Sequence, residues 1–413
     1  MNFSKIIIGS LICLWVVSCK QKEQSSLQVP KENDFLVAID STLQLAVEQY
    51  SYLSQQVEPG VYPRTFQNDS LVTSDSGWWC SGFYPGTLLY LDEAIDAPKL
   101  KEEAISFMAD LKREQYNKST HDLGFMMYCS FGNANRLQPN PEYQDILLNS
   151  AKSLVTRYND TVQAIRSWDS APWNRAGEDD LVVIIDNMMN LEMLFWATEY
   201  TQDSTYYDIA VKHADKTLRN HFREDYSSYH EVIYDEATGD VKAQITRQGA
   251  SDSSAWARGQ AWGLYGYVVM YRFTQDPKYL NQAQQIAEFI LTHSNLPDDQ
   301  IPYWDYDAPK IPNTYRDSSA AAIMASAFLE LSTFSDEGKS ETYYQSAERI
   351  LKNLMTPHYL AQKGKNGGFL LKHGVGDLPN NSEIDVPLTY GDYYFVEAMI
   401  RYKELNTNRR NNS

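Results

Sequence analysis

The chain has 413 residues, of which 43% are hydrophobic and 13% are aromatic, so it contains enough apolar material for a large core. Its formal net charge of -18 argues against nucleic acid or an anionic membrane surface as a partner. The length allows one large domain or two ordinary ones, but the body has no internal linker rich in Pro, Gly or Ser. We therefore expect a single domain over residues 34–406, followed by a polar tail at residues 407–413.

The first residues have the pattern of a targeting segment. Lys5 precedes an apolar run from Ile6 to Val17, which is too short to span a bilayer, and Ser18 and Cys19 follow it. This arrangement resembles a bacterial lipoprotein signal, with residues 1–18 removed and Cys19 lipidated. We expect residues 19–33 to form a flexible tether, and the charged sequence KQKEQ after Cys19 favours an anchor in the outer membrane, at the periplasmic face or the cell surface.

Two cysteines, Cys80 and Cys129, remain in the body of the chain, which is too few for a disulfide scaffold or a cysteine metal site. A single bridge between them is one alternative, and buried free thiols are the favoured one. The sequence has no histidine pair with zinc spacing, no glycine-rich phosphate loop and no serine in a nucleophile elbow. We therefore predict neither a metal nor a cofactor.

Helical periodicity dominates the body, and a turn residue, a tyrosine and an alanine at helical spacing recur about every 60 to 75 residues. Amphipathic helices that can form an outer layer are predicted at 35–57, 98–116, 141–158, 204–222, 277–293 and 340–355. Helices that are apolar on nearly every side, and therefore buried, are predicted at 81–96, 122–131, 181–200, 256–275, 317–335 and 389–405. Strict alternation predicts an all-α fold, a barrel of six α/α hairpins. Strand signals at 229–234 and 241–246 predict one β-hairpin on a loop.

Polar and aromatic clusters precede the inner helices or lie in their first turns. They lie at 76–82, 121–122, 178–186, 230–258, 315–319 and 390–392. If the inner helices run parallel, these ends meet at one mouth of the barrel, where helix N-termini favour an anion. The sequence thus predicts one pocket.

The stretch from Gln248 to Gly266 is the richest of these clusters. It combines Trp256 and Trp262 with Arg258 and the amide of Gln248. Aromatic faces beside hydrogen-bonding groups suit a sugar, and the planar fork of Arg258 suits a carboxylate. The alternative is a core helix with interior aromatic residues.

Two aspartates are candidates for acid and base chemistry. Asp186 lies in the apolar sequence VVIIDNMMNLEMLF, where desolvation would keep its carboxyl neutral, unless Asn187, Asn190 or the backbone satisfies it. Asp122, in HDLGF, is either a second carboxylate of the site or a helix N-cap. Two carboxyl groups in an aromatic cleft are the usual requirement for cleaving a glycosidic bond. His230, on the predicted hairpin, is either structural or part of the site.

These motifs together resemble the unsaturated glucuronyl hydrolases of glycoside hydrolase family 88. The resemblance runs from about Phe35 to Leu405 and rests on HDLGF at 121–125, IIDNMMNLEML at 184–194, SSYH at 227–230, TRQG at 246–249, WARGQAWGLYG at 256–266 and YGDYYF at 390–395. It implies the same six-hairpin barrel. It also implies that Asp186 is the acid/base and Asp122 the second essential aspartate, with His230, Gln248, Arg258 and Trp262 lining the sugar subsite.

The implied reaction is hydration of the C4–C5 double bond of an unsaturated uronic acid at the non-reducing end of an oligosaccharide supplied by a polysaccharide lyase. The loop Ser251-Asp252-Ser253-Ser254 departs from the family, whose members often have a second aspartate where Ser253 stands, so the substrate preference is open. Ulvan-type oligosaccharides are favoured, and glycosaminoglycan or gellan/xanthan fragments remain. Two alternatives stay open: an unsaturated rhamnogalacturonyl hydrolase acting on pectin fragments, and a surface glycan-binding lipoprotein without catalysis.

Overall fold

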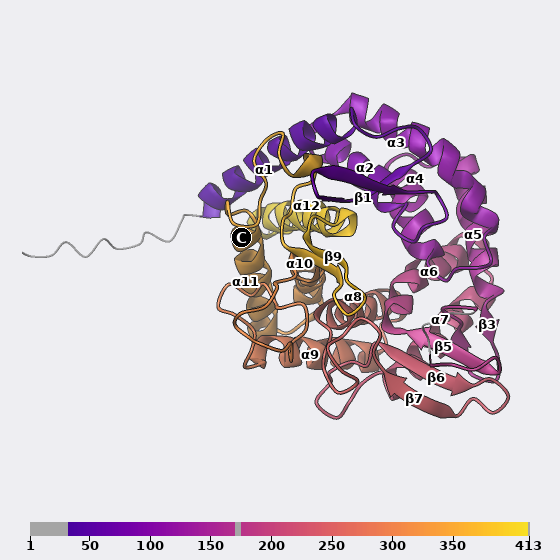
Figure 1. Ribbon diagram of the computed structural model, residues 1–413. Helices are drawn as coiled ribbons and strands as arrows, with labels where there is room; N and C mark the ends of the chain where they lie inside the picture. The colour runs from indigo at the N-terminus through magenta and orange to yellow at the C-terminus, as the bar shows by residue number, and fades with distance from the viewer. Residues whose placement is uncertain (1–31, 170–174, 412–413) are drawn as a thin grey trace, which may run out of the picture.

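The computed structural model describes residues 32–169 and 175–411, and in it the chain winds around a ring with one layer of helices inside another (Figure 1). The outer layer contains α1 (Glu32–Leu53), α3 (Pro98–Leu111), α5 (Pro141–Val155), α7 (Ser204–Asn220), α9 (Pro277–Thr292) and α11 (Glu337–Leu354). The inner layer contains α2 (Phe83–Ile95), the π-helix η2 (Gly124–Gly132) continued by α4 (Asn133–Leu137), α6 (Leu191–Thr201), α8 (Ala257–Thr274), α10 (Ser318–Phe334) and α12 (Thr389–Asn411). The predicted all-α fold is confirmed.

The recurring tyrosine and alanine of the outer helices face the inner layer. In α9, Asp276 caps the first turn by accepting a hydrogen bond from the Lys278 amide, and Pro277 occupies the first helical position. Tyr279 and Ala283 then follow at helical spacing, and both are fully buried. The sequence repeat is therefore the buried stripe of an amphipathic helix.

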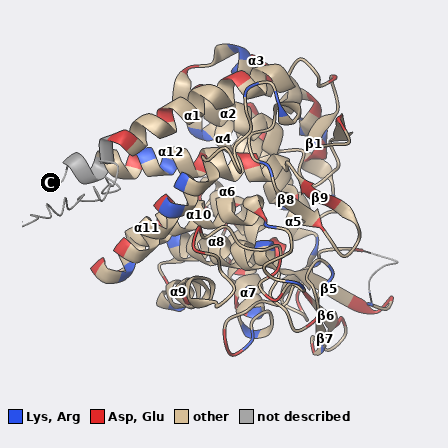
Figure 2. Cartoon of the chain, turned by 60° about the vertical axis from the view of Figure 1, so that its left-hand side comes forward, with Lys and Arg blue, Asp and Glu red and all other residues tan. Residues whose placement is uncertain are grey.

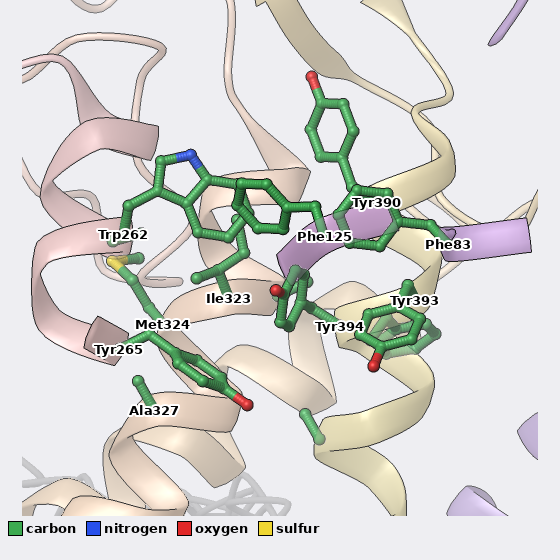
Figure 3. Close-up of a cluster of buried hydrophobic side chains, with 14 of the residues drawn as sticks. Phe83, Phe125, Trp262, Tyr265, Ile323, Met324, Ala327, Tyr390, Tyr393 and Tyr394 are labelled. Carbon is green, nitrogen blue, oxygen red and sulfur yellow. The ribbon is translucent and has the colours of Figure 1, made fainter. Parts of the chain in front are cut away.

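The inner helices pack on several sides at once, which explains their apolar composition. Every residue of α8 from Ala257 to Met270 is buried. Close approach needs small residues, since a Cβ on Gly266 would lie 2.5 Å from Cβ of Met188. Aromatic rings from four inner helices meet in the centre (Figure 3), where the ring centroids of Phe125 and Trp262 lie 5.1 Å apart.

The predicted hairpin is confirmed as β6 (Glu231–Asp235) and β7 (Val241–Ile245), and β5 (Asp180–Ile184) extends it to three strands. The prediction of one helix over residues 181–200 is therefore wrong in its first half. Residues 180–184 form β5, the 3₁₀ helix η3 (Ile185–Asn190) follows, and α6 begins only at Leu191. All five residues of β5 are buried, so its apolar run has no alternation that distinguishes a strand from a buried helix.

Three further hairpins were not predicted from the sequence. They are β1 (Tyr62–Gln67) with β2 (Ser70–Ser74), β3 (Tyr158–Asn159) with β4 (Ala164–Ile165), and β8 (Gly374–Asp377) with β9 (Ser382–Val386). β9, with the sequence SEIDV, has no buried side chain and only two apolar residues, so its strand signal is weak. Its Glu383 and Asp385 also have positive φ, which is unusual for a strand.

Acidic and basic residues are mixed along the outer helix α11, whereas the charged residues of α1 are all acidic (Figure 2). None of the helices among the described residues is long and apolar enough to span a membrane. The predicted signal segment, the predicted lipidation site Cys19 and the predicted tether up to residue 31 lie outside the described residues. Cys80 and Cys129 are free thiols within the described ranges, as the favoured interpretation predicts, but only Cys80 is buried, whereas Cys129 is partly exposed.

Candidate active site

Four inner segments bring their N-terminal ends together. Asp186 lies in the first turn of η3 and Arg258 in the first turn of α8. Asp317 caps α10, and its Oδ2 lies 3.7 Å from Nη1 of Arg258. The ring of Tyr390, at the start of α12, has its centroid 5.1 Å from the Arg258 guanidinium carbon. The clusters that are scattered in the sequence thus form one site, as expected.

Asp186 is only 9% exposed, and its Oδ2 has no hydrogen-bond partner among the described residues. Burial raises the pKa of its carboxyl to about 7, with the positive charge of Arg258 opposing and the negative charge of Asp122 adding to the rise. Such a carboxyl exchanges its proton near neutral pH, as a general acid and base must.

The two asparagines that could have satisfied Asp186 are engaged elsewhere. Asn187 donates to the Ile165 carbonyl at 2.7 Å. Asn190 Oδ1 accepts hydrogen bonds from the amides of Gly124 at 2.8 Å and Phe125 at 3.2 Å. Asn190 therefore caps the start of η2, and Asp186 is not an aspartate held by its neighbouring asparagines.

His230 lies beside Asp186, in the residue that precedes β6. Its Nδ1 accepts hydrogen bonds from the backbone amides of Arg247 at 3.1 Å and Gln248 at 3.3 Å, so the proton of the neutral ring is on Nε2. Nε2 lies 3.8 Å from Asp186 Oδ2. Burial holds the pKa of His230 well below its usual range, so the ring is neutral and presents an N–H toward Asp186.

Asp122 does not act as the cap of η2, because Asn190 takes that role. Its Oδ2 accepts a hydrogen bond from Thr120 Oγ1 at 3.2 Å, and its Oδ1 lies 3.2 Å from Nε2 of His121. Burial raises the pKa of Asp122 to about 7. Because the charge of Asp122 raises the pKa of Asp186, the two carboxyl groups share one electrostatic environment.

Arg258 is buried and holds the β8–β9 hairpin over the site. Its Nη1 donates to the Val375 carbonyl, and its Nη2 donates to the Gly376 carbonyl at 2.7 Å. Gln248 donates to the same Gly376 carbonyl at 3.1 Å. The sequence predicts that the Arg258 fork is open to a carboxylate, but each terminal nitrogen already donates to a backbone carbonyl of the unpredicted β8–β9 hairpin. Its Nε–H has no partner in the described parts of the chain.

The two indoles of the Gln248–Gly266 stretch line the same region. Trp256 lies beside His230, with ring centroids 4.8 Å apart, and under the Arg258 guanidinium at 4.4 Å. Trp262 is fully buried, and its indole N–H lacks a partner among the described residues. Sequence reasoning missed Trp168, which is partly exposed and approaches the rings of His121 and His230 edge-on at 6.5 and 6.4 Å. The sequence signal that could have identified Trp168 is an indole within a polar loop.

Several buried polar atoms at this site have no hydrogen-bond partner among the described residues, so they are available to a bound ligand. They are His121 Nε2, Asp186 Oδ2, His230 Nε2, Arg258 Nε, Trp262 Nε1, Asp317 Oδ2 and Tyr390 Oη, and other such atoms lie elsewhere in the fold. A cavity of about 550 Å³ lies at the other ends of the inner helices, but its Arg272 and Arg401 are paired with glutamates. Across the ranges that the structure describes, no cluster of three or more His, Cys, Asp or Glu could hold a metal ion.

The loop that departs from the family pattern lies next to β7. Asp252 is paired with Arg175 at 2.7 Å and accepts a hydrogen bond from the Thr246 amide at 2.9 Å. Ser253 is exposed, and its hydroxyl lies 3.1 Å from that of Ser251. The serine that replaces an acid is therefore on the surface of this loop.

Two buried carboxyl groups with raised pKa values, set among indoles at one mouth of a helical barrel, define a glycoside hydrolase site. Comparison with known proteins agrees. A family model, glycosyl hydrolase family 47, matches residues 263–371, which is less than half of the chain. An unsaturated glucuronyl hydrolase of Formosa agariphila is 46% identical over 330 residues, covering 79% of this chain and 80% of that protein.

Two further similarities cover most of the chain. An unsaturated chondroitin disaccharide hydrolase of Streptococcus pyogenes is 33% identical over 383 residues, covering 91% of this chain and 94% of that protein. The crystal structure of an unsaturated glucuronyl hydrolase specific for heparin has a TM-score of 0.86 at 45% identity, covering 90% of this chain and 98% of that one. The chain therefore belongs to the unsaturated glucuronyl hydrolase family and is a glycoside hydrolase, which confirms the resemblance carried by its motifs.

Proposed function

We propose that Asp186 is the general acid and base that hydrates the C4–C5 double bond of an unsaturated uronic acid. The observation that carries this assignment is its unpartnered Oδ2, with a pKa near 7, beside the Nε2–H of His230. Asp186 gives its proton to C4, and as water adds to C5 the carboxylate takes a proton from that water. The hemiketal at C5 then opens and releases the next sugar, and Asp186 is again protonated.

The other site residues bind and orient the sugar. His230, a neutral donor, orients the attacking water or a hydroxyl near Asp186, while Trp256 supplies an apolar face. Trp262, which the motif resemblance placed in the sugar subsite, is fully buried and packs behind the site against Phe125. The buried charge of Arg258 attracts the uronate carboxylate. Gln248 and Arg258 both donate to the Gly376 carbonyl and so fix the β8–β9 hairpin beside the site. This local charge is needed because the protein as a whole carries -18 and repels anions at long range.

The substrate is an oligosaccharide that a polysaccharide lyase has cut, since a lyase leaves the 4,5-unsaturated uronic acid at the non-reducing end. We propose an anionic polysaccharide as its origin, either ulvan-type or a glycosaminoglycan. The names of the similar proteins support a glycosaminoglycan, because they mention chondroitin and heparin. The lipoprotein-like signal and acidic composition support an algal glycan.

The assay is the loss of ultraviolet absorbance of the conjugated uronate, measured separately on lyase digests of ulvan, chondroitin, heparin and pectin. Decay on one digest identifies the substrate class. Asp186→Asn should lose nearly all turnover and still bind the oligosaccharide, because the amide keeps the shape and loses the proton. Near-normal activity would refute the acid/base assignment, and binding without decay on any digest would favour a capture protein.

We also propose that the chain is anchored by lipid on Cys19 in the outer membrane, at its periplasmic face or the cell surface. The apolar run that ends at Ser18-Cys19 supports this proposal. Metabolic labelling with a fatty-acid analogue tests it. Label should be incorporated into the natural chain and absent from Cys19→Ala, and equal labelling of both would contradict it.

A further inference from the structure

The loop at residues 246–254 holds the ring of His230 in one tautomer. Its backbone amides of Arg247 and Gln248 donate to His230 Nδ1 at 3.1 and 3.3 Å. The ring proton is therefore on Nε2, which lies 3.8 Å from Asp186 Oδ2. Which nitrogen of a neutral histidine carries the proton is set by the hydrogen bonds of the ring. His230 thus remains a donor toward Asp186 only while the 246–254 loop keeps its place.

The buried carboxylate of Asp305 fastens this loop. Asp305 is fully buried and lies in the segment between α9 and α10, 55 positions after Ala250. Its Oδ2 accepts hydrogen bonds from the Ala250 amide at 2.8 Å and from the Ser254 hydroxyl at 2.7 Å. Its Oδ1 accepts one from the Asp307 amide at 2.8 Å. One side chain from outside the loop thus binds the loop at two points.

The loop packs against Asp305 so closely that it needs a glycine there. A Cβ on Gly249 would lie 2.6 Å from Thr246 Oγ1 and 3.1 Å from Asp305 Oδ2. The Gly249 amide donates to the same Thr246 hydroxyl at 2.8 Å. Gly249 directly follows Gln248, whose amide binds the histidine ring. A short series of contacts therefore connects the Asp305 carboxylate with His230.

Two other contacts hold the first part of the loop. The Thr246 amide donates to Asp252 at 2.9 Å, and the Gln248 side chain donates to the Gly376 carbonyl at 3.1 Å. Asp305 holds the second part, which follows the two amides that bind the ring. Without Asp305, these two amides are held from one side only.

We propose that Asp305 is a positioning residue that keeps His230 in its Nε2–H tautomer by fastening the 246–254 loop. When the loop moves away, the ring proton moves from Nε2 to Nδ1 by exchange with solvent, and the charge of the ring does not change. Nε2 then accepts the proton of Asp186 in a hydrogen bond, which competes with its transfer to C4 of the sugar. The effect on turnover rests on the proposed function, but the tautomer can be measured without turnover.

The direct test is nitrogen-15 NMR of the protein labelled at histidine. The natural protein should show His230 with its proton on Nε2, and loss of that signal in His230→Gln assigns it. His121 gives the reference for the other tautomer, because its Nδ1 lies 2.8 Å from the Ser167 carbonyl oxygen, which can only accept. In Asp305→Ala the population of His230 with its proton on Nδ1 should rise about tenfold. An unchanged His230 signal in the folded variant would overturn the proposal.

Asp392→Ala is the matched control for the loss of a buried carboxylate. Asp392 is also fully buried, and it accepts hydrogen bonds from the amides of residues 370–371 at 2.7 and 2.8 Å and from the Tyr50 hydroxyl at 3.1 Å. Its loss should lower the stability about as much as the loss of Asp305 does, and it should leave the His230 tautomer unchanged. A similar change of tautomer in both variants would mean a general loosening of the fold and would contradict the proposal.

Gly249→Ala perturbs the same contact without removing the carboxylate, so it keeps the test decisive if Asp305→Ala does not fold. The added methyl group displaces the loop from Asp305, and the His230 tautomer should shift in the same direction. In both variants kcat should fall about tenfold, whereas KM should change little because Arg258 keeps its contacts with β8. A shifted tautomer with unchanged kcat would refute the positioning role. If the tautomer shifts and the natural protein turns over no digest, the proposed function fails and the link between Asp305 and His230 stands.

Discussion

The buried carboxyl of Asp186 should make the enzyme less stable as the pH rises. Its pKa in the folded protein is about 7, whereas the model value for an aspartate in the unfolded chain is 3.8. The folded state therefore holds this proton more tightly than the unfolded state does. The stabilisation is complete below the unfolded pKa and is lost as the pH rises through the folded pKa of about 7. Asp186→Asn removes the titrating group and should remove this dependence.

The size of the effect follows from the two pKa values. At about 1.4 kcal/mol for each pH unit, the change from 3.8 to about 7 corresponds to roughly 4 kcal/mol. Asp186 is only 9% exposed, so solvent screens little of this difference. Asp186→Asn should thus be more stable than the natural protein by up to about 4 kcal/mol at about pH 8.5, and nearly equal to it at about pH 4.

Urea unfolding followed by circular dichroism at several pH values measures this difference. Asp203→Asn is the control, because Asp203 is an exposed cap of α7 and asparagine caps a helix as well as aspartate does. That variant should show no gain in stability at high pH. The reasoning is refuted if Asp186→Asn has the same stability difference at every pH, since the effect would then come from packing, or if it is less stable at high pH.

Three other predictions test how the site is held. Asn190→Ala leaves two buried amides at the start of η2 without their acceptor, so the free energy of unfolding should fall by about 2–4 kcal/mol; a loss below about 0.5 kcal/mol would contradict the capping role. Arg258→Lys loses the guanidinium fork that binds two carbonyls of β8, and it should lower kcat/KM about 10- to 100-fold. Arg136→Lys, the control at an exposed ion pair, should leave kcat/KM unchanged. Similar losses in both variants would argue against a special role of the Arg258 fork. Burial raises the pKa of both Cys80 and Cys129, so neither should react with a thiol reagent at neutral pH until the protein unfolds, and fast labelling of the native protein would refute this.

The helices and their order could be predicted from the sequence alone, for a physical reason. Each outer helix buries one stripe, and each inner helix is buried on several sides, so both kinds leave a periodic or continuous apolar pattern along the chain. The same reasoning located Asp186 and Asp122, because an acid within an apolar run requires an explanation. The density of aromatic and polar residues in the sequence also identified the cluster around Arg258 and the candidate His230.

Only the tertiary structure decided which residues that are far apart along the chain are in contact. The cap of η2 comes from Asn190, the partners of Arg258 come from β8, and the tautomer of His121 is set by the Ser167 carbonyl. Such contacts have no regular spacing along the sequence, so no local sequence pattern predicts them. The sequence by itself determined which side chains are present at the mouth of the barrel, and the fold determined which of them hold protons, because burial and distant partners set a pKa and a tautomer.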